Sequence, residues 1–178
     1  MVNLVRLNPE QKIVVSSAVV ALVFSTTFVT VAYHFFPLNF LGLETPVERL
    51  IFALRWQIIP ALMLFAGVAT VGNYRFVSPA INPLAKAESE QMQVHLRYLS
   101  NTLEQVILFA IASLICATFL DGETIKLIPI LSVLFGAGRI LFWLGYLQQP
   151  MYRALGMGIT LYPTALMLFW DAYQVFTH

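Results

Sequence analysis

The chain has 178 residues, of which 59% are hydrophobic and 11% are charged, and its formal net charge is +1. Soluble domains carry roughly 25% charged residues, so this chain could not cover a water-facing surface evenly. The composition excludes a disordered chain, an ordinary soluble enzyme and a nucleic-acid binder driven by basic charge. The single cysteine, Cys116, excludes a disulfide framework, and three scattered histidines indicate no metal site. The sequence therefore predicts an integral membrane protein that contacts lipids and no nucleic acid.

Five apolar runs are long enough, or nearly so, to cross a membrane, since a spanning helix needs about 20 residues. These runs are continuously apolar, which excludes a β-barrel, because apolar and polar residues alternate along the strands of a membrane barrel. In chain order the runs are Ile13 to Phe36, about Leu50 to Val71, about Thr102 to Leu120, about Leu127 to Leu147 and about Ile159 to Phe176. The first run is too long for the apolar part of a signal peptide, so we predict a retained helix.

The longest connection between the runs extends from about Gly72 to Leu99. From Ala87 onward its residues favour a helix. We therefore predict that the third helix begins before the membrane and enters it near Arg97.

Basic residues in short loops indicate the orientation of the spans, because they favour the cytoplasmic side. With five spans, the N-terminus and the second and fourth loops share one side, and the first and third loops share the other. The first side holds Arg6, Lys12, Arg75, Lys86, Arg97 and Arg153, and the second holds Arg49 and Lys126. The sequence predicts a cytoplasmic N-terminus, in a bacterial inner membrane or an organelle membrane.

A few polar residues are predicted to lie at membrane depth, where a charge costs at least about 2.5–3.5 kcal/mol. They are Arg55, Asn101, Glu104, Arg139 and Asp171. The simplest interpretation of Arg55 is that its side chain reaches the interface. Asp171 lies near the chain end, where we expect it to meet water.

Two neighbouring predicted helices each carry one polar stripe, because residues spaced i, i+4, i+7 share a helix face. The stripes are Arg97, Asn101 and Glu104 on the third helix and Arg139, Trp143 and Tyr146 on the fourth.

Two interpretations of these stripes are open. In the first, Glu104 and Arg139 form a buried structural pair that fixes packing. In the second, the stripes line a polar pocket for an anionic ligand, since arginines hold carboxylates through charge-assisted hydrogen bonds. The residues of that pocket would be Arg97, Asn101, Tyr146 and Arg153.

Three ordered segments resemble motifs of the MAPEG family, the membrane-associated proteins in eicosanoid and glutathione metabolism. The segment 95–109, HLRYLSNTLEQVILF, is similar to the family's second-helix signature of an arginine followed by Asn-x-x-Glu. The segment 138–146, GRILFWLGY, resembles its third-helix motif, and the segment 150–158, PMYRALGMG, resembles the start of its last helix. The resemblance covers about Leu50 to the C-terminus.

The resemblance implies an all-α membrane fold, with a MAPEG-like four-helix domain over residues 50–178. Residues 1–49 would hold an additional N-terminal transmembrane helix and its connecting loop. The resemblance also implies a homotrimer with glutathione sites between subunits, open toward the cytoplasm. The five-span arrangement is similar to that of one MAPEG-like protein.

The family's functional positions can be matched residue by residue. Glutathione contacts would fall on Arg97, Asn101, Glu104 and Tyr146, and in a looser match on Arg75. Arg153 falls on or beside the arginine that stabilises the glutathione thiolate, and Arg139 matches a structural arginine.

The chain departs from the family pattern at several positions. Leu99 and Ser100 occupy the stretch where family transferases carry a second basic residue, and Ala154 follows Arg153 where a small polar residue is common. The run from Ile13 to Phe36 has no counterpart in the four-helix core.

The leading functional prediction is a membrane-embedded glutathione-dependent transferase or peroxidase that acts on lipophilic electrophiles or hydroperoxides. The alternative is a non-catalytic protein that kept the MAPEG fold and lost glutathione chemistry. A third hypothesis is a small transporter or lipid-binding protein that uses Glu104 and Arg139 as a relay.

Overall fold

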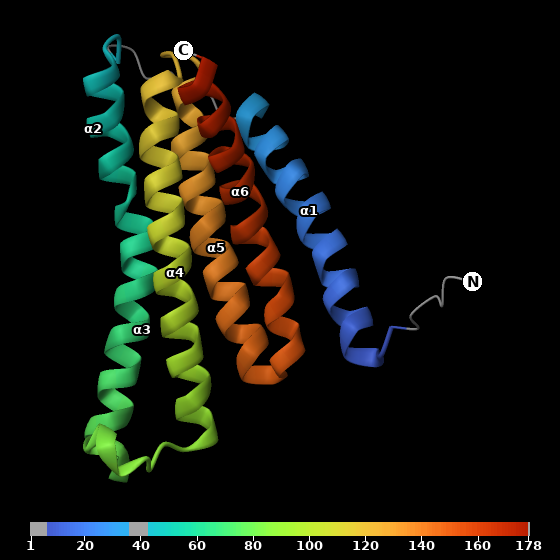
Figure 1. Cartoon of the computed structure of the whole chain (residues 1–178), viewed down its shortest axis with the longest axis vertical. Coiled ribbons are helices and arrows are strands. Elements are labelled where there is room, and N and C mark those ends of the chain that lie inside the picture. Colours follow the sequence, from blue (N-terminus) through green and yellow to red (C-terminus); the bar gives the residue numbers. More distant parts are fainter. Residues whose placement is uncertain (1–6, 36–42, 178) are drawn as a thin grey trace.

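A computed structural model describes residues 7–35 and 43–177 of the chain, and in these ranges it contains helices and no strands (Figure 1). The α-helices are α1 (Pro9–Phe35), α2 (Pro46–Trp56), α3 (Ile58–Phe76), α4 (Glu90–Phe119), α5 (Leu127–Gln148) and α6 (Arg153–Thr177). Short 3₁₀ turns η1 (Pro79–Ile81), η2 (Pro83–Ala85), η3 (Thr124–Lys126) and η4 (Pro150–Tyr152) connect them. Arg6 and Phe36, which entered the predictions above, lie outside the described residues.

The helices form an elongated bundle in which α2 and α3 follow one another, and the chain then reverses direction at each connection (Figure 1). The start of α1, the α3–α4 connection and the α5–α6 turn lie toward one end of the bundle. The predicted all-α membrane bundle is confirmed.

Four stretches in the described part of the chain are long and apolar enough to cross a membrane. They are Pro9–Phe35, Pro46–Phe76, Glu90–Phe119 and Thr124–Gln148. The fifth predicted span corresponds to α6, which has 25 residues and packs along α5 but is not one of these four stretches.

The second span is divided into α2 and α3 by an irregularity at Gln57. Pro60 has no N–H to donate to the carbonyl of Trp56, so the regular ladder is interrupted there. Just before it, the Gln57 N–H donates to the Leu54 carbonyl at 3.2 Å and not to that of Ala53. The Gln57 side chain replaces this bond, because its Nε2 donates to the Ala53 carbonyl at 3.2 Å and to Ser113 Oγ on α4 at 2.9 Å. A side chain within the span thus donates a hydrogen bond to a backbone carbonyl for which lipid offers no donor.

Helix α4 begins well before its apolar stretch, as the sequence predicted. Ser89 caps it by accepting a hydrogen bond from the Met92 N–H at 3.2 Å. Its first two turns are therefore ordered ahead of Arg97.

Helices α5 and α6 pack closely against each other, and glycines make this possible. A Cβ on Gly156 would lie 2.1 Å from the Phe142 backbone nitrogen and 2.5 Å from the Gly138 carbonyl oxygen. A Cβ on Gly145 would lie 2.7 Å from the Tyr152 carbonyl oxygen. Small residues allow such backbone approach in membrane helices, where packing rather than water drives association.

Helix α1 packs mainly against α6, and through it joins the central apolar core. Ala21 is fully buried in a cluster with Phe109, Leu134 and Ile159, which come from α4, α5 and α6. The additional helix is therefore part of the bundle in the described structure.

Asp171 does not meet water in this chain, contrary to the prediction. It lies on the inner face of α6 with 3% of its surface exposed, and neither carboxylate oxygen has a hydrogen-bond partner among the described residues. The reason is the helical register, because Asp171 follows buried Met167 and Thr164 at spacings of four and seven residues.

Asp171→Asn is expected to stabilise the purified protein by about 1–2 kcal/mol, since a buried carboxylate without partners carries an uncompensated desolvation cost. Thermal unfolding in one detergent at neutral pH measures the change. Glu123→Gln, at an exposed position before α5, is the matched control and should leave stability within about 0.5 kcal/mol of the wild type. A less stable Asp171→Asn variant would show that the carboxylate has a partner outside this chain.

Candidate functional site

The centre of the bundle holds a fully buried arginine, Arg139, on α5. Its Nη1 donates to Asn101 Oδ1 on α4 at 2.8 Å, and its Nη2 donates to Thr160 Oγ1 on α6 at 2.7 Å. A longer contact of 3.5 Å joins Nη2 to the Gly156 carbonyl. One side chain therefore ties α4, α5 and α6 together.

Aromatic rings complete the surroundings of this guanidinium. Its Cζ lies 4.5 Å from the ring centre of Phe142 and 5.8 Å from that of Phe135. Ring faces attract a cation most strongly where water is excluded. Arg139 is thus held by an amide, a hydroxyl and two rings.

The structure does not bring Glu104 to Arg139 as an ion pair within one chain. Glu104 is exposed, whereas the buried face of α4 runs through its neighbours Thr102 and Gln105. The i, i+4, i+7 spacing places Arg97, Asn101 and Glu104 on one flank of α4, and only Asn101 is close enough to the core to reach Arg139. The partner of Arg139 on α4 is therefore Asn101, whereas the sequence predicted Glu104.

Two predicted site residues, Tyr146 and Arg153, do meet at the α5–α6 turn. The Arg153 guanidinium lies over the Tyr146 ring, with 4.7 Å between Cζ and the ring centre. The Tyr146 ring in turn meets Phe142 edge to face at 5.9 Å. A continuous series of ring contacts therefore connects half-buried Arg153 at the end of the bundle with Arg139 in its centre.

The other predicted site residues lie apart from this group in the single chain. Arg97 and Glu104 are exposed on the flank of α4. Arg75, at the end of α3, is half-buried, and its Nε has no hydrogen-bond partner among the described residues. The chain by itself assembles Tyr146 with Arg153 and Asn101 with Arg139, presents Arg97 and Glu104 outward, and leaves Arg75 half-buried away from both groups.

The sequence interpretation missed an aromatic cluster around His95. Trp143 Nε1 donates to His95 Nδ1 at 3.0 Å, and the Trp143 ring stacks on Tyr98 with centres 4.0 Å apart. Tyr98 donates its hydroxyl to the Met63 carbonyl on α3 at 3.0 Å. The available signal was the spacing of Met92, His95, Tyr98 and Thr102 along α4, which marks a buried face even though two of its members are polar.

Together, the long apolar helices, the close glycine contacts and the buried arginine define a polytopic α-helical membrane protein with a polar centre. The chain belongs to the MAPEG family, whose family model matches residues 50–173. Two similar relatives are both Transmembrane protein 79, or mattrin: that of Mus musculus is 29% identical and that of Bos taurus 28% identical, each over 162 residues. The alignments cover 91% of this chain and 41% of each relative, so the chain spans about two fifths of their length. No solved structure matches this chain.

Proposed function

We propose that the chain is a membrane-embedded, glutathione-dependent transferase or peroxidase that acts on lipophilic electrophiles or hydroperoxides. The observation that carries this proposal is the half-buried Arg153 guanidinium, which lies over the Tyr146 ring at 4.7 Å. Among the described residues no carboxylate pairs with Arg153, so its charge is available to an anionic ligand.

The chemistry of this pair suits a thiolate. When bound, glutathione would supply the sulfur nucleophile, and its thiol is mostly protonated in neutral water because thiol pKa values lie near 8.5. A nearby guanidinium favours the ionised sulfur, more strongly in a half-buried site than in bulk water. The Tyr146 ring limits the positions available to the Arg153 side chain and leaves its N–H groups free to donate.

The outward-facing residues of α4 suit the rest of the tripeptide. Arg97 can hold a carboxylate, and Glu104 can hold the α-ammonium group. The Asn101 Oδ1 is already occupied by Arg139, which leaves its Nδ2 to donate to the ligand.

We further propose that the functional unit is a homotrimer. Glu104 is exposed on a helix that is apolar enough to span a membrane, and an ionised carboxylate facing lipid is costly. A neighbouring subunit packed on this flank would remove Glu104 from lipid and bring a second surface to Arg97. Native mass spectrometry in detergent should show three chains.

A second candidate function is the non-catalytic one. The observation that favours it is the engagement of Asn101 by Arg139, which makes an expected glutathione contact part of the packing of the bundle. In that case the fold would persist without any affinity for glutathione.

Arg153→Ala is expected to bind glutathione with an affinity within about threefold of the wild type. The ultraviolet absorbance of the bound thiolate should fall roughly tenfold, because a rise of one unit in the thiol pKa corresponds to about 1.4 kcal/mol in the ionisation equilibrium. Conjugation of a lipophilic electrophile should fall with it. Arg97→Ala should instead weaken glutathione binding with the thiolate fraction of the bound ligand unchanged.

Arg49→Ala is the matched control, since Arg49 lies on α2 and donates to the Leu43 and Glu44 carbonyls, away from the site. Absence of glutathione binding to the wild type at millimolar concentration would support the non-catalytic function. An undiminished thiolate signal in Arg153→Ala would assign the role to another arginine, with Arg75 the next to test.

We also propose that the end of the bundle that holds Arg153 faces the cytoplasm. Lys12, Arg75, Lys86, Arg97 and Arg153 all belong to the predicted positive side. Cysteines introduced at Ser78 and Gly122 should differ in labelling from outside intact cells, with Gly122→Cys the accessible one. Efficient labelling of Ser78→Cys alone would reverse the orientation.

A further inference from the structure

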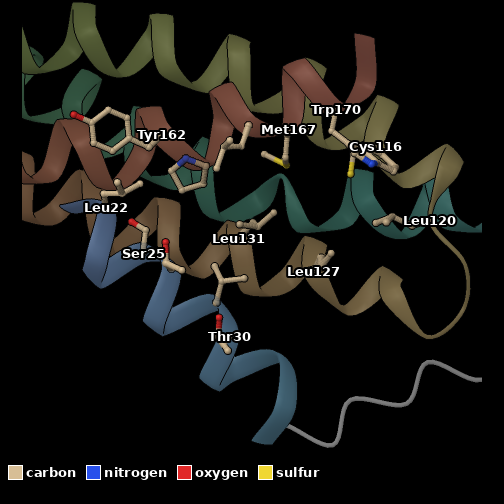
Figure 2. A pocket seen from close by; sticks show the side chains of 14 residues that line it. Leu22, Ser25, Thr30, Cys116, Leu120, Leu127, Leu131, Tyr162, Met167 and Trp170 are labelled. Carbon is tan, nitrogen blue, oxygen red and sulfur yellow. The ribbon is translucent and has the colours of Figure 1, made fainter. Parts of the chain in front are cut away.

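A cavity of about 370 Å³ lies between α1 and residues of α4, α5 and α6, and it opens to the outside of the bundle beside exposed Leu22 and Leu166 (Figure 2). Its volume falls within the range of about 300–1,000 Å³ that is typical of small-molecule sites. Most of its lining is apolar and none of it is charged, as illustrated by Leu22, Val29, Leu131, Tyr162 and Trp170. An uncharged, lipophilic molecule fits these walls.

Among the described residues, Ser25 Oγ is the buried polar atom of the cavity wall that has no hydrogen-bond partner. Ser25 is only 4% exposed, and its Oγ makes no hydrogen bond to any described residue. A serine within a helix commonly donates to the carbonyl four residues earlier, which here would be that of Ala21. Because a buried hydroxyl without a hydrogen-bond partner is energetically unfavourable, a ligand oxygen at this point would recover that cost.

We propose that this cavity binds a single-chain lipid that carries a hydroxyl group, with that hydroxyl hydrogen-bonded to Ser25 Oγ. Serine both donates and accepts, so it matches a ligand hydroxyl in either direction. At about 30 Å³ for each water-sized group, the cavity holds roughly a dozen such groups, the size of a medium-length alkyl chain with its terminal oxygen. A charged headgroup would find no counter-charge among the lining residues.

The proposed lipid site is separate from the glutathione site. Cys116, Leu120 and Trp170 line the cavity and lie near the end of α4 and in the last part of α6. Arg153 lies at the start of α6, at the opposite end of the bundle (Figure 1). The lipid would therefore be a resident ligand and not the molecule that reacts with glutathione.

The site depends on the additional helix. Leu22, Ser25, Val29 and the neighbouring threonines come from α1, which precedes the residues matched by the family model. Figure 2 shows α1 forming one wall of the cavity and α5 and α6 forming the others. Ser25 and Thr30 lie along the α1 wall. Helix α1 thus supplies the hydroxyl that would select the ligand.

Contact quenching of tryptophan fluorescence tests the proposal, since Trp170 lines the cavity. The wild-type chain in phosphatidylcholine vesicles is titrated with 11-bromoundecan-1-ol, whose bromine quenches an indole on contact. We expect a saturable component of quenching that Trp170→Phe abolishes. The unhydroxylated analogue 1-bromoundecane should bind at least about fivefold more weakly, as expected for one lost hydrogen bond.

Two α1 variants separate recognition from general effects on the helix. Ser25→Ala should weaken the saturable component about fivefold, and Ser25→Leu, which also fills the cavity, should remove it. Ser16→Ala is the matched control, because Ser16 is exposed on the same helix and donates to the Ile13 carbonyl at 3.0 Å. It should behave as the wild type.

Several results would overturn the proposal. Quenching that rises linearly with probe and never saturates would mean that the probe only partitions into the bilayer. Equal binding of the alcohol and the bromoalkane, or equal effects of Ser25→Ala and Ser16→Ala, would remove the role of Ser25. Saturable quenching that appears only when oligomers are dissociated would show that a second copy of the chain covers the cavity.

Discussion

Gly156→Leu is expected to prevent the α5–α6 hairpin from closing and to destabilise the protein by at least about 3 kcal/mol. Even the first added carbon would lie 2.1 Å from the Phe142 backbone nitrogen and 2.5 Å from the Gly138 carbonyl oxygen. These atoms belong to a helix backbone and cannot rotate away as a flexible side chain would. Unfolding in a denaturing detergent, followed by circular dichroism, measures the loss.

Gly72→Ala is the control for this substitution. Gly72 lies in α3, and a Cβ there would meet no atom within 4 Å. Since alanine is a better helix former than glycine, the variant should be as stable as the wild type or slightly more stable. A Gly156→Leu variant that matched it would show that the two helices do not pack as closely as described.

Asn101→Leu is the second substitution for which we expect a large effect. It removes the 2.8 Å hydrogen bond to Arg139 Nη1 and leaves a fully buried guanidinium with fewer partners. Hydrogen bonds to charged groups contribute about 1.5–3 kcal/mol in soluble proteins, and values inside membranes are smaller. We expect a loss of about 1–3 kcal/mol in the free energy of unfolding.

Two companion variants identify the partner of Arg139. Asn101→Asp keeps the accepting oxygen and adds an opposite charge, so it should retain the stability of the wild type or exceed it. Glu104→Ala should change stability by less than about 0.5 kcal/mol in the isolated chain, because Glu104 is exposed. A larger effect of Glu104→Ala than of Asn101→Leu would restore the Glu104–Arg139 pair.

The aromatic cluster shows why the charged residues alone gave an incomplete account of the site. His95 and Tyr98 lie on the buried face of α4, while Arg97 between them is exposed. The charged residues of α4 lie on the flank of the helix. The residues that recur at helical spacing, whether polar or apolar, lie on the face that packs into the bundle. The difference is one residue, or about 100° around the helix.

The sequence by itself determined the membrane class, the family and the approximate bounds of the helices. The reason is that length and continuous hydropathy are local properties, and the ordered motifs from His95 to Gly158 are specific. The beginning of α4 before its apolar stretch was also predictable, from the helix-favouring residues after Ala87.

Only the tertiary structure decided which polar residues meet. Whether Arg139 faced Asn101 or Glu104 depended on the rotation of α4 against α5, which composition and spacing do not fix within one residue. The burial of Asp171 and the unpaired hydroxyl of Ser25 likewise arise from helices distant in the chain, because a side chain becomes buried only when another helix packs over it.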